Sequence, residues 1–315
     1  MFEKTELQII AIEKEIDLLE SEPVNELKTL RKTQLVRNRD ELLEVAKKLS
    51  AQDKVYLARH PKRPNITEYI EAIFDDFMEL KGDRQCCEDS AVLGGIASFH
   101  GLAVTVIGHC KGANLEENLK CNFGMAGPEG YRKALRLMKQ AEKFSRPVIT
   151  FIDTPGAYPG IEAEARGQGE AIARNLAEMS MLKTPIISIV TGEGSSGGAL
   201  ALGVADSVFM LENAVYSILS PEGFATILWK DSSRSGEACE LMKLTAQDLK
   251  QYGIIERIIS EPLGGAHRGT KELFQEIDSA LREELTDLKK LSADDLCAKR
   301  QKKFRNIGDA DALLQ

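Results

Sequence analysis

One segment of the chain combines glycines with small polar residues and is the first candidate for chemistry. It spans residues 192–200 and reads GEGSSGGAL, after a β-branched run at 186–190 and leading into a small-residue, helix-like run at 199–205. A buried strand that passes through glycines into a helix exposes backbone N–H groups at the turn. Such a turn is suited to negative charge, which could belong to a phosphate, an acyl oxyanion or an enolate.

Two known glycine motifs fit this segment incompletely. The spacing GxGxxG over 192–197 matches a dinucleotide-binding fingerprint, which belongs to the first strand–helix unit and needs an acidic residue about 20 residues further on. Here several units come first, and Glu212 follows too early. The spacing GxSxG over 194–198 matches a nucleophile elbow with Ser196 as the nucleophile. A serine hydrolase of this kind also needs an acid and a histidine, and His267 is the only histidine downstream.

A third interpretation needs no side-chain nucleophile. The amides of Gly197 and Gly198, with Ala199 beside them, would donate hydrogen bonds to a developing oxyanion. Glycine suits these positions because a Cβ atom would obstruct the close approach of a ligand. Losing one such donor typically costs about 10²–10³ in rate. The alternative is that the glycines only allow tight packing of the helix on the strand.

A second cluster of glycines and prolines favours the ligand interpretation. It spans 153–160, reads DTPGAYPG and follows the predicted strand 147–152, so it should lie at the same edge of the core as the first segment. Two prolines and two glycines make it a stiff, irregular loop. Asp153 is interpreted as a helix cap or turn former, and Tyr158 as a wall for a flat apolar ligand. The candidate substrate-binding residues are Gly156, Ala157, Tyr158 and Ala199.

The overall composition excludes several classes of protein. The chain has 315 residues and a formal net charge of −8, which argues against non-specific nucleic-acid binding. It has no run of about 18 apolar residues, and its first residues resemble neither a signal nor a transit peptide. We therefore expect a cytoplasmic protein without membrane contact. The six cysteines include no CxxC pair, so we expect reduced thiols and neither a metal site nor a disulfide framework.

Hydrophobic periodicity divides the chain into a helical arm, a core and a helical tail. Residues 1–54 are predicted to form a charged helical hairpin turning at 21–23. This arm either lies on its own domain or grips a partner. Residues 55–268 alternate strands and helices, which predicts an α/β core of repeated ββα units. Residues 269–315 are predicted to be a polar helical tail.

The core elements can be placed from the same pattern. Strands are expected at 92–99, 102–108, 147–152, 185–190, 207–211, 214–219 and 254–259, the first two joined by a tight turn at His100-Gly101. Helices are expected at 128–144, 162–182 and 237–251.

Several segments of the core resemble the alpha subunit of bacterial acetyl-coenzyme A carboxylase carboxyltransferase. They are the two glycine clusters and the segments NFGM (122–125), PEGYRKALRLM (128–138), RGQGEAIARNL (166–176), SPEG (220–223) and EPLGGAH (261–267). The resemblance covers roughly residues 55–270. One departure is Ser195-Ser196, where that family often has Gly-Ser, and a small residue at 195 should still fit.

The resemblance implies a crotonase-like core and an enzyme built from two kinds of chain. In that family the alpha chain pairs with a beta chain, usually as an α2β2 heterotetramer, and the active site lies between them. The reaction moves a carboxyl group from carboxybiotin, carried on the biotin carboxyl carrier protein, to acetyl-CoA, giving malonyl-CoA for fatty acid synthesis. Biotin carboxylase completes the full complex.

The resemblance also assigns roles to residues and cofactors. Catalytic oxyanion donors fall at Gly197 and Gly198, and the structural zinc belongs to the beta chain. This chain is then expected to bind no cofactor covalently and no metal. The remaining alternative is a crotonase-fold serine hydrolase that uses Ser196.

A basic set on the expected helix 128–144 has two interpretations. It consists of Arg132, Lys133, Arg136 and Lys139. These side chains either form a solvated helix face or contact the phosphates of CoA or an acidic carrier surface, next to a helix start that favours anions. Lys111 is a weaker candidate of the same kind.

Overall fold

The chain is built around one sheet of eight strands. The computed structural model describes residues 2–21 and 25–308. The strand order is β1-β2-β3-β4-β5-β6-β8, and the short β7 pairs with β5 off this path. The strands are β1 (Asp75–Glu79), β2 (Val92–Phe99), β3 (Leu102–His109), β4 (Val148–Thr154), β5 (Ile186–Ser195), β6 (Ser207–Leu211), β7 (Val215–Ser217) and β8 (Arg257–Ile259). The predicted α/β core is confirmed.

The direction of the strands decides where the candidate residues meet. β1, β2 and β3 pair antiparallel, and the β2–β3 turn lies at His100-Gly101 as predicted. From β3 onward the sheet is parallel through β4, β5, β6 and β8. The carboxyl ends of neighbouring parallel strands lie at one edge, so the loops after β4 and β5 lie side by side. The register at this edge pairs Thr154 with Gly194.

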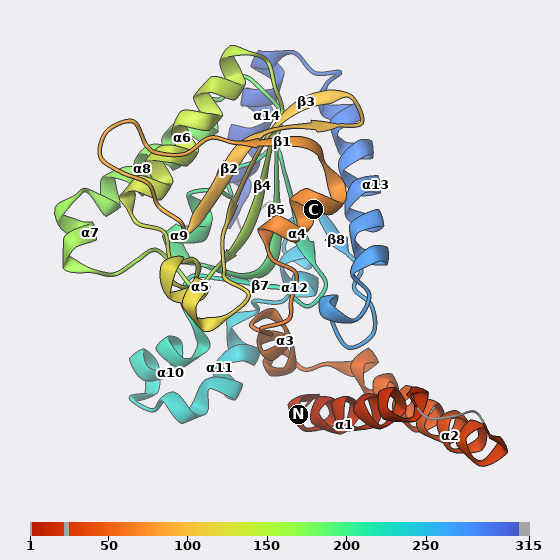
Figure 1. The fold of residues 1–315 in the computed structure, drawn as a ribbon. Coiled ribbons are helices and arrows are strands. Elements are labelled where there is room, and N and C mark those ends of the chain that lie inside the picture. Colours follow the sequence, from red (N-terminus) through yellow and green to blue (C-terminus); the bar gives the residue numbers. More distant parts are fainter. Residues whose placement is uncertain (1, 22–24, 309–315) are drawn as a thin grey trace.

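Helices cover both faces of the sheet (Figure 1). α6 (Pro128–Lys143), α8 (Gln168–Met181) and α14 (Ala293–Asn306) pack on one face, and α4 (Ile66–Ile73) and α13 (Thr270–Leu288) on the other. Shorter helices lie in the connections. They are α3 (Ala51–Ala58), α5 (Leu115–Lys120), α7 (Ile161–Ala165), α9 (Ser196–Leu200), α10 (Pro221–Trp229), α11 (Ser235–Met242) and α12 (Ala246–Gln251).

Two helices that the sequence predicts as continuous are each divided in the structure. The helix expected at 162–182 is α7 followed by α8, because Gly167 between them has a left-handed φ of 87°. The helix expected at 237–251 is α11 followed by α12. Lys243 ends α11 with a φ of 51°, and the side chain of Thr245 begins α12 through a capping box. Both divisions come from local turn chemistry that helical periodicity does not reveal.

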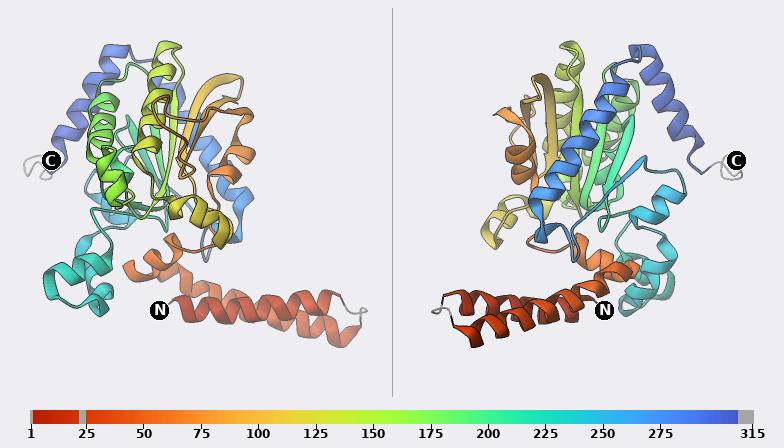
Figure 2. Two further views of the ribbon diagram at one scale, coloured as in Figure 1. Left: turned by 60° about the vertical axis from the view of Figure 1, so that its left-hand side comes forward. Right: turned by 90° about the vertical axis from the view of Figure 1, so that its right-hand side faces the viewer.

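The predicted helical arm is present at one end of the core (Figure 2). It consists of α1 (Phe2–Glu20) and α2 (Glu26–Leu43), followed by a 3₁₀ turn at Glu44–Lys48. α1 has four buried residues and α2 has none, so α1 is the helix that holds the arm to the core. Two residues of the predicted turn, 22 and 23, lie outside the described residues. The division of the chain at residue 54 stays a prediction.

The predicted helical tail forms α13 and α14. Its apolar side chains do not stand apart from the core: Leu273, Ile277 and Leu281 belong to the same buried cluster as the strands. On α14 the side chain of Arg300 is 1% exposed. It binds both carboxylate oxygens of Asp206, at 2.9 and 2.8 Å, and donates to three backbone carbonyls. The proposed boundary at residue 268 therefore cuts through a continuous core, and it too stays a prediction.

We expect Arg300→Met to lower the free energy of unfolding by about 3–5 kcal/mol, because it leaves the carboxylate of Asp206 buried without its partner. Chemical denaturation of the isolated chain measures this change. The control is Arg305→Met on the exposed side of the same helix, which should change it by at most about 0.5 kcal/mol. Equal effects of the two substitutions would contradict the assignment.

Candidate active site

The glycine-rich segment begins inside the sheet. β5 continues to Ser195 with every residue buried, so it is longer than the strand expected at 185–190. The chain then turns at Ser196, which has a left-handed φ of 57°, and enters the five-residue helix α9. A strained residue between a buried strand and a helix projects its backbone and side chain away from the sheet. This is the backbone geometry that both the hydrolase and the oxyanion interpretations require.

The amides after this turn have no hydrogen-bond acceptor within the described residues. Ser195 precedes α9 without a side-chain cap. No acceptor in the described part of the chain takes a hydrogen bond from the amides of Gly197 or Gly198. Gly197 is half-buried and Gly198 is buried. Unpaired amides at a partly covered position are what an oxyanion site needs.

Gly198 brings the two glycine clusters into contact. A Cβ atom built on it would lie 2.6 Å from the nitrogen of Ala157, 2.7 Å from the carbonyl carbon of Gly156 and 2.9 Å from Oη of Tyr131. No side chain fits there, because two of these three neighbours are backbone atoms. The packing interpretation of the glycines is therefore correct at this position, and it coexists with the free amides.

The second cluster has a backbone that depends on glycine as well. Gly156 has a φ of 143°, a conformation that only glycine adopts readily. The hydroxyl of Thr154 fixes it by accepting from the amide of Gly156 at 3.1 Å and donating to its carbonyl at 2.7 Å. The amide of Tyr158 donates to the carbonyl of Ala126 at 2.9 Å. The loop is thus rigid, as its prolines predict.

Asp153 joins the two clusters, a role that the sequence did not reveal. Its Oδ1 accepts from the backbone amide of Glu193 at 2.9 Å and from Nζ of Lys111 at 2.6 Å. A Cβ atom on Gly192 would collide with the same carboxylate. The only signal in the sequence was that an acid and a glycine follow neighbouring strands. Asp153 is a bridge between loops rather than a helix cap.

An apolar cavity of about 740 Å³ opens beside Gly197. Its walls come mainly from α9, β7, α10, α11 and the end of α14. The apolar lining includes Leu200, Tyr216, Ile218, Phe224, Leu241 and Phe304. Of the six candidate residues, Gly197 lines this cavity, whereas Gly156, Ala157, Tyr158, Gly198 and Ala199 do not. The side chain of Tyr158 is instead engaged with Glu162, and this hydrogen bond raises the pKa of the tyrosine.

Each side chain of the basic set on α6 contacts another group of this chain. Lys133 is buried and contacts Glu88 and the carbonyl of Asp89. The other partners are Asp83 and Glu129 for Arg132, the carbonyls of Leu80 and Gly82 for Arg136, and Glu178 for Lys139. The contacts of Arg132, Lys133 and Arg136 hold the segment between β1 and β2 against the helix. Lys139 is exposed and pairs with α8. The structure therefore gives a structural role to side chains that we considered for CoA phosphates.

None of the four histidines is placed to act as a general base for Ser196. No hydrogen bond joins its hydroxyl to a histidine in the described residues. His267 and His60 face the carboxylate of Glu6, His100 pairs with Asp278 at 2.7 Å, and His109 is buried. Burial lowers the pKa of His109 to about 4, so this ring is neutral near pH 7. The turn has the shape of a nucleophile elbow but lacks the base.

All six cysteines are free. Within the described ranges, no helix is both long and apolar enough to cross a membrane.

Comparison with known proteins extends over nearly the whole chain. The family described as acetyl co-enzyme A carboxylase carboxyltransferase-like matches residues 2–308. The acetyl-coenzyme A carboxylase carboxyl transferase subunit alpha of Clostridium perfringens strain SM101 is 60% identical over 264 residues, which are 84% of this chain and 97% of the relative. The subunit of the same name from Anoxybacillus flavithermus is 58% identical over 261 residues, which are 83% of this chain and 80% of the relative.

Solved structures with the same fold are more distant in sequence. Transcarboxylase 12S, with methylmalonyl-coenzyme A bound, superposes with a TM-score of 0.57 at 20% identity, over 71% of this chain and 42% of its own. This chain thus spans about two fifths of the transcarboxylase polypeptide. A Pseudomonas malonate decarboxylase hetero-tetramer in complex with coenzyme A gives 0.57 at 16% identity, over 70% and 86% of the two chains.

These structural likenesses establish a crotonase-like fold, and the sequence comparisons do not support the serine hydrolase alternative. Fold, sequence and the geometry of the glycine turn agree: the chain belongs to the family of acetyl-coenzyme A carboxylase carboxyltransferase alpha subunits.

Proposed function

We propose that this chain supplies half of a shared active site, in which a carboxyl group passes from carboxybiotin on a carrier protein to acetyl-CoA to give malonyl-CoA. The observation that carries the proposal is the pair of unpartnered amides at Gly197 and Gly198, of which Gly197 lines an apolar cavity. Carboxybiotin supplies the carboxyl group. Gly197 and Gly198 are the catalytic residues of this chain, because their amides donate to the oxygen on which negative charge develops.

The other candidate residues support these donors. Gly156 and Ala157 form the surface against which Gly198 packs, and Ala199 continues the same turn. The side chain of Tyr158 is held by Glu162. Once a partner chain covers them, the apolar walls beside Gly197 would exclude water, so that each hydrogen bond to the developing anion acts in a medium of low dielectric constant.

We also propose that a beta chain completes the site. Apolar side chains next to the cavity are exposed in this chain: Ile218 is 76% exposed, and Ile227, Leu228 and Leu241 are exposed as well. Ile218 and Leu241 line the cavity, and Ile227 and Leu228 lie on α10, which contributes to its wall. Several exposed apolar side chains in one region are typical of a protein–protein interface. The expected assembly is an α2β2 heterotetramer that works with the biotin carboxyl carrier protein and biotin carboxylase in the cytoplasm. The structural zinc is expected in the beta chain.

The decisive experiment combines this chain with a beta chain of the same enzyme family. We expect malonyl-CoA-dependent carboxylation of biocytin by the mixture and by neither chain alone. Activity of this chain alone would contradict a shared site. A mixture that forms a stable complex but carries out no transfer would contradict the proposed reaction.

Gly197→Val should reduce carboxyl transfer about 10²–10³-fold, because its side chain crowds the two donor amides. An ideal Cβ at Gly197 meets only Ile172, at 3.4 Å, so the variant should fold. Gly198 is a poorer test, since a Cβ there collides with the backbone of the second loop. The control is Gly169→Val, where a Cβ has open space. Unreduced transfer by the Gly197 variant in the assembled complex would argue against an oxyanion role.

Ile218→Glu should weaken binding of the beta chain by at least about 30-fold, because it puts a charge into an apolar interface. Sedimentation or titration of the two chains measures the affinity. The comparison is Leu27→Glu on the arm, where the leucine is 79% exposed. If only the Leu27 variant loses binding, the arm and not the cavity surface grips the partner.

A further inference from the structure

Arg59 ties the end of β5 to helix α10. Its guanidinium donates to Oε1 of Glu193, at 3.1 Å from Nε and 2.7 Å from Nη2. The other side of the same group donates to Glu222, at 2.8 Å from Nη1 and 3.3 Å from Nη2. A planar guanidinium that binds two carboxylates holds both at a set distance and angle.

The two carboxylates belong to the parts of the protein that form the candidate site. Glu193 is buried in β5, three residues before the turn at Ser196, and its amide carries the hydrogen bond to Asp153. Glu222 lies in the first turn of α10, two residues before Phe224 in the cavity wall. Burial lowers the pKa of Arg59, but the carboxylates of Glu222 and Glu193 raise it more, so the guanidinium stays charged. Arg59 thus sets the wall of the cavity relative to the donor amides.

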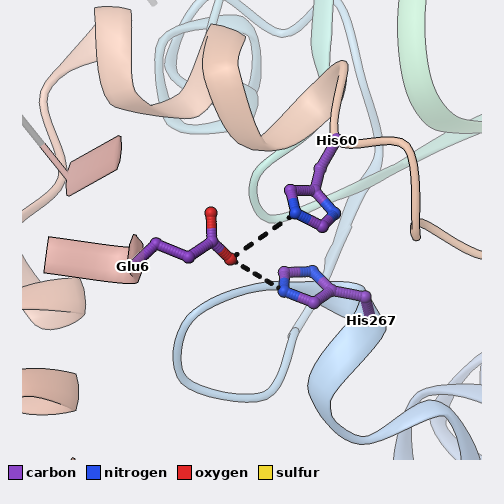
Figure 3. Close-up of side chains that lie close together, drawn as sticks. All are labelled: Glu6, His60 and His267. Atoms are coloured by element: carbon purple, nitrogen blue, oxygen red, sulfur yellow. Dashed lines mark hydrogen bonds and ion pairs between the residues drawn. The ribbon is translucent and has the colours of Figure 1, made fainter. Parts of the chain in front are cut away.

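The segment that carries Arg59 is itself fixed by the arm (Figure 3). His60 stacks on His267 with ring centroids 4.0 Å apart. Oε1 of Glu6, from α1, lies 2.9 Å from Nε2 of His267 and 3.7 Å from Nε2 of His60. Glu6 is fully buried. Burial raises the pKa of this carboxyl, but hydrogen bonds from His267 and Tyr56 lower it by more. The pKa therefore lies below its usual value, and the carboxyl is ionised.

Two histidines and a carboxylate also resemble a metal site, and the contacts do not fit one. The amide of Lys62 donates to Nδ1 of His60 at 3.2 Å. The neutral ring therefore carries its proton on Nε2, the atom that faces Glu6, whereas a metal-binding Nε2 requires the proton on Nδ1. Nε2 of both rings lies near the same oxygen of Glu6, but the rings are stacked and within 16° of parallel, so the in-plane lone pairs of the two nitrogens do not both point at one ion. Arg268 lies 3.7 Å from the same carboxylate and would oppose a cation.

We propose that Arg59 is a positioning residue for the carboxyl-transfer turn, and that Glu6 of the arm holds Arg59 in place through His60. This proposal rests on the function proposed above. Arg59 does not line the cavity beside Gly197. It acts by keeping Glu193 and Glu222 at the separation at which the amides and the cavity wall face the same ligand.

The test measures carboxyl transfer by the assembled complex with variants at Arg59. Arg59→Met should lower kcat about 10- to 100-fold, the typical cost of a small displacement of catalytic groups. KM for malonyl-CoA and the affinity for the beta chain should not change. Arg59→Lys should restore part of kcat, because lysine keeps the positive charge but lacks the planar guanidinium that binds two carboxylates at once. The matched control is Lys62→Met in the same segment, where the lysine is exposed, and it should keep wild-type kcat.

Two milder variants keep the proposal testable if Arg59→Met does not fold. Glu222→Gln removes one of the two carboxylates that pair with Arg59, at a half-exposed side chain. It should lower kcat several-fold. Glu6→Gln removes the charge of α1 that faces His60 and His267. It should also lower kcat several-fold. Its control is Glu15→Gln, which removes an exposed ion pair with Arg31 within the arm and should have no effect.

The outcomes separate this proposal from the proposed function. Wild-type kcat in a folded Arg59→Met or Glu222→Gln complex would overturn the positioning role. The role would also be overturned if the Arg59→Met complex loses kcat only together with assembly or melting temperature, and Arg59→Lys restores no part of kcat. Absence of transfer by the wild-type complex would instead contradict the function itself.

Discussion

The structure depends on a contact between two loops at a point where no side chain can be accommodated. Gly198 packs on the backbone of Gly156 and Ala157, and the amide of Glu193 binds the carboxylate of Asp153. The first contact requires glycine on one side, and the second requires an acid on the other. Together they fix the turn after β5 relative to the loop after β4. The donor amides at Gly197 and Gly198 are thereby held in place without using their own hydrogen bonds.

Buried charge does much of the positioning in this protein. Arg59, Arg63 and Arg300 each join elements that lie far apart in the sequence, and Glu6 gathers two histidines from two segments. Arg63, Arg300 and Glu6 are buried, and removing their charges from water costs free energy that their ion pairs offset. Their geometry is correspondingly specific. The shared active site that we propose would use such rigidity, since a surface that is already formed before the partner binds costs less free energy to dock.

Much of the fold followed from the sequence. Alternating strands and helices predicted the α/β core, and the β2–β3 turn and α6 lie where expected. The breaks at Gly167 and Lys243 were missed, because a single left-handed residue interrupts a helix without disturbing its hydrophobic period. The tail was predicted as polar, yet it buries Leu273 and Ile277. A helix with one narrow apolar side looks polar on average.

The turn in the glycine segment, and the chemistry that we propose for it, follow from the sequence alone. Strand, glycines and helix follow one another locally, so residue types at short spacing specify a turn with open amides. Which charged side chains support that turn was decided only by the tertiary structure. The basic set on α6 looked available for phosphates, and the fold paired each member internally. Arg59 and Glu6 carried no local signal at all, because their partners are brought near only when the sheet and the arm assemble.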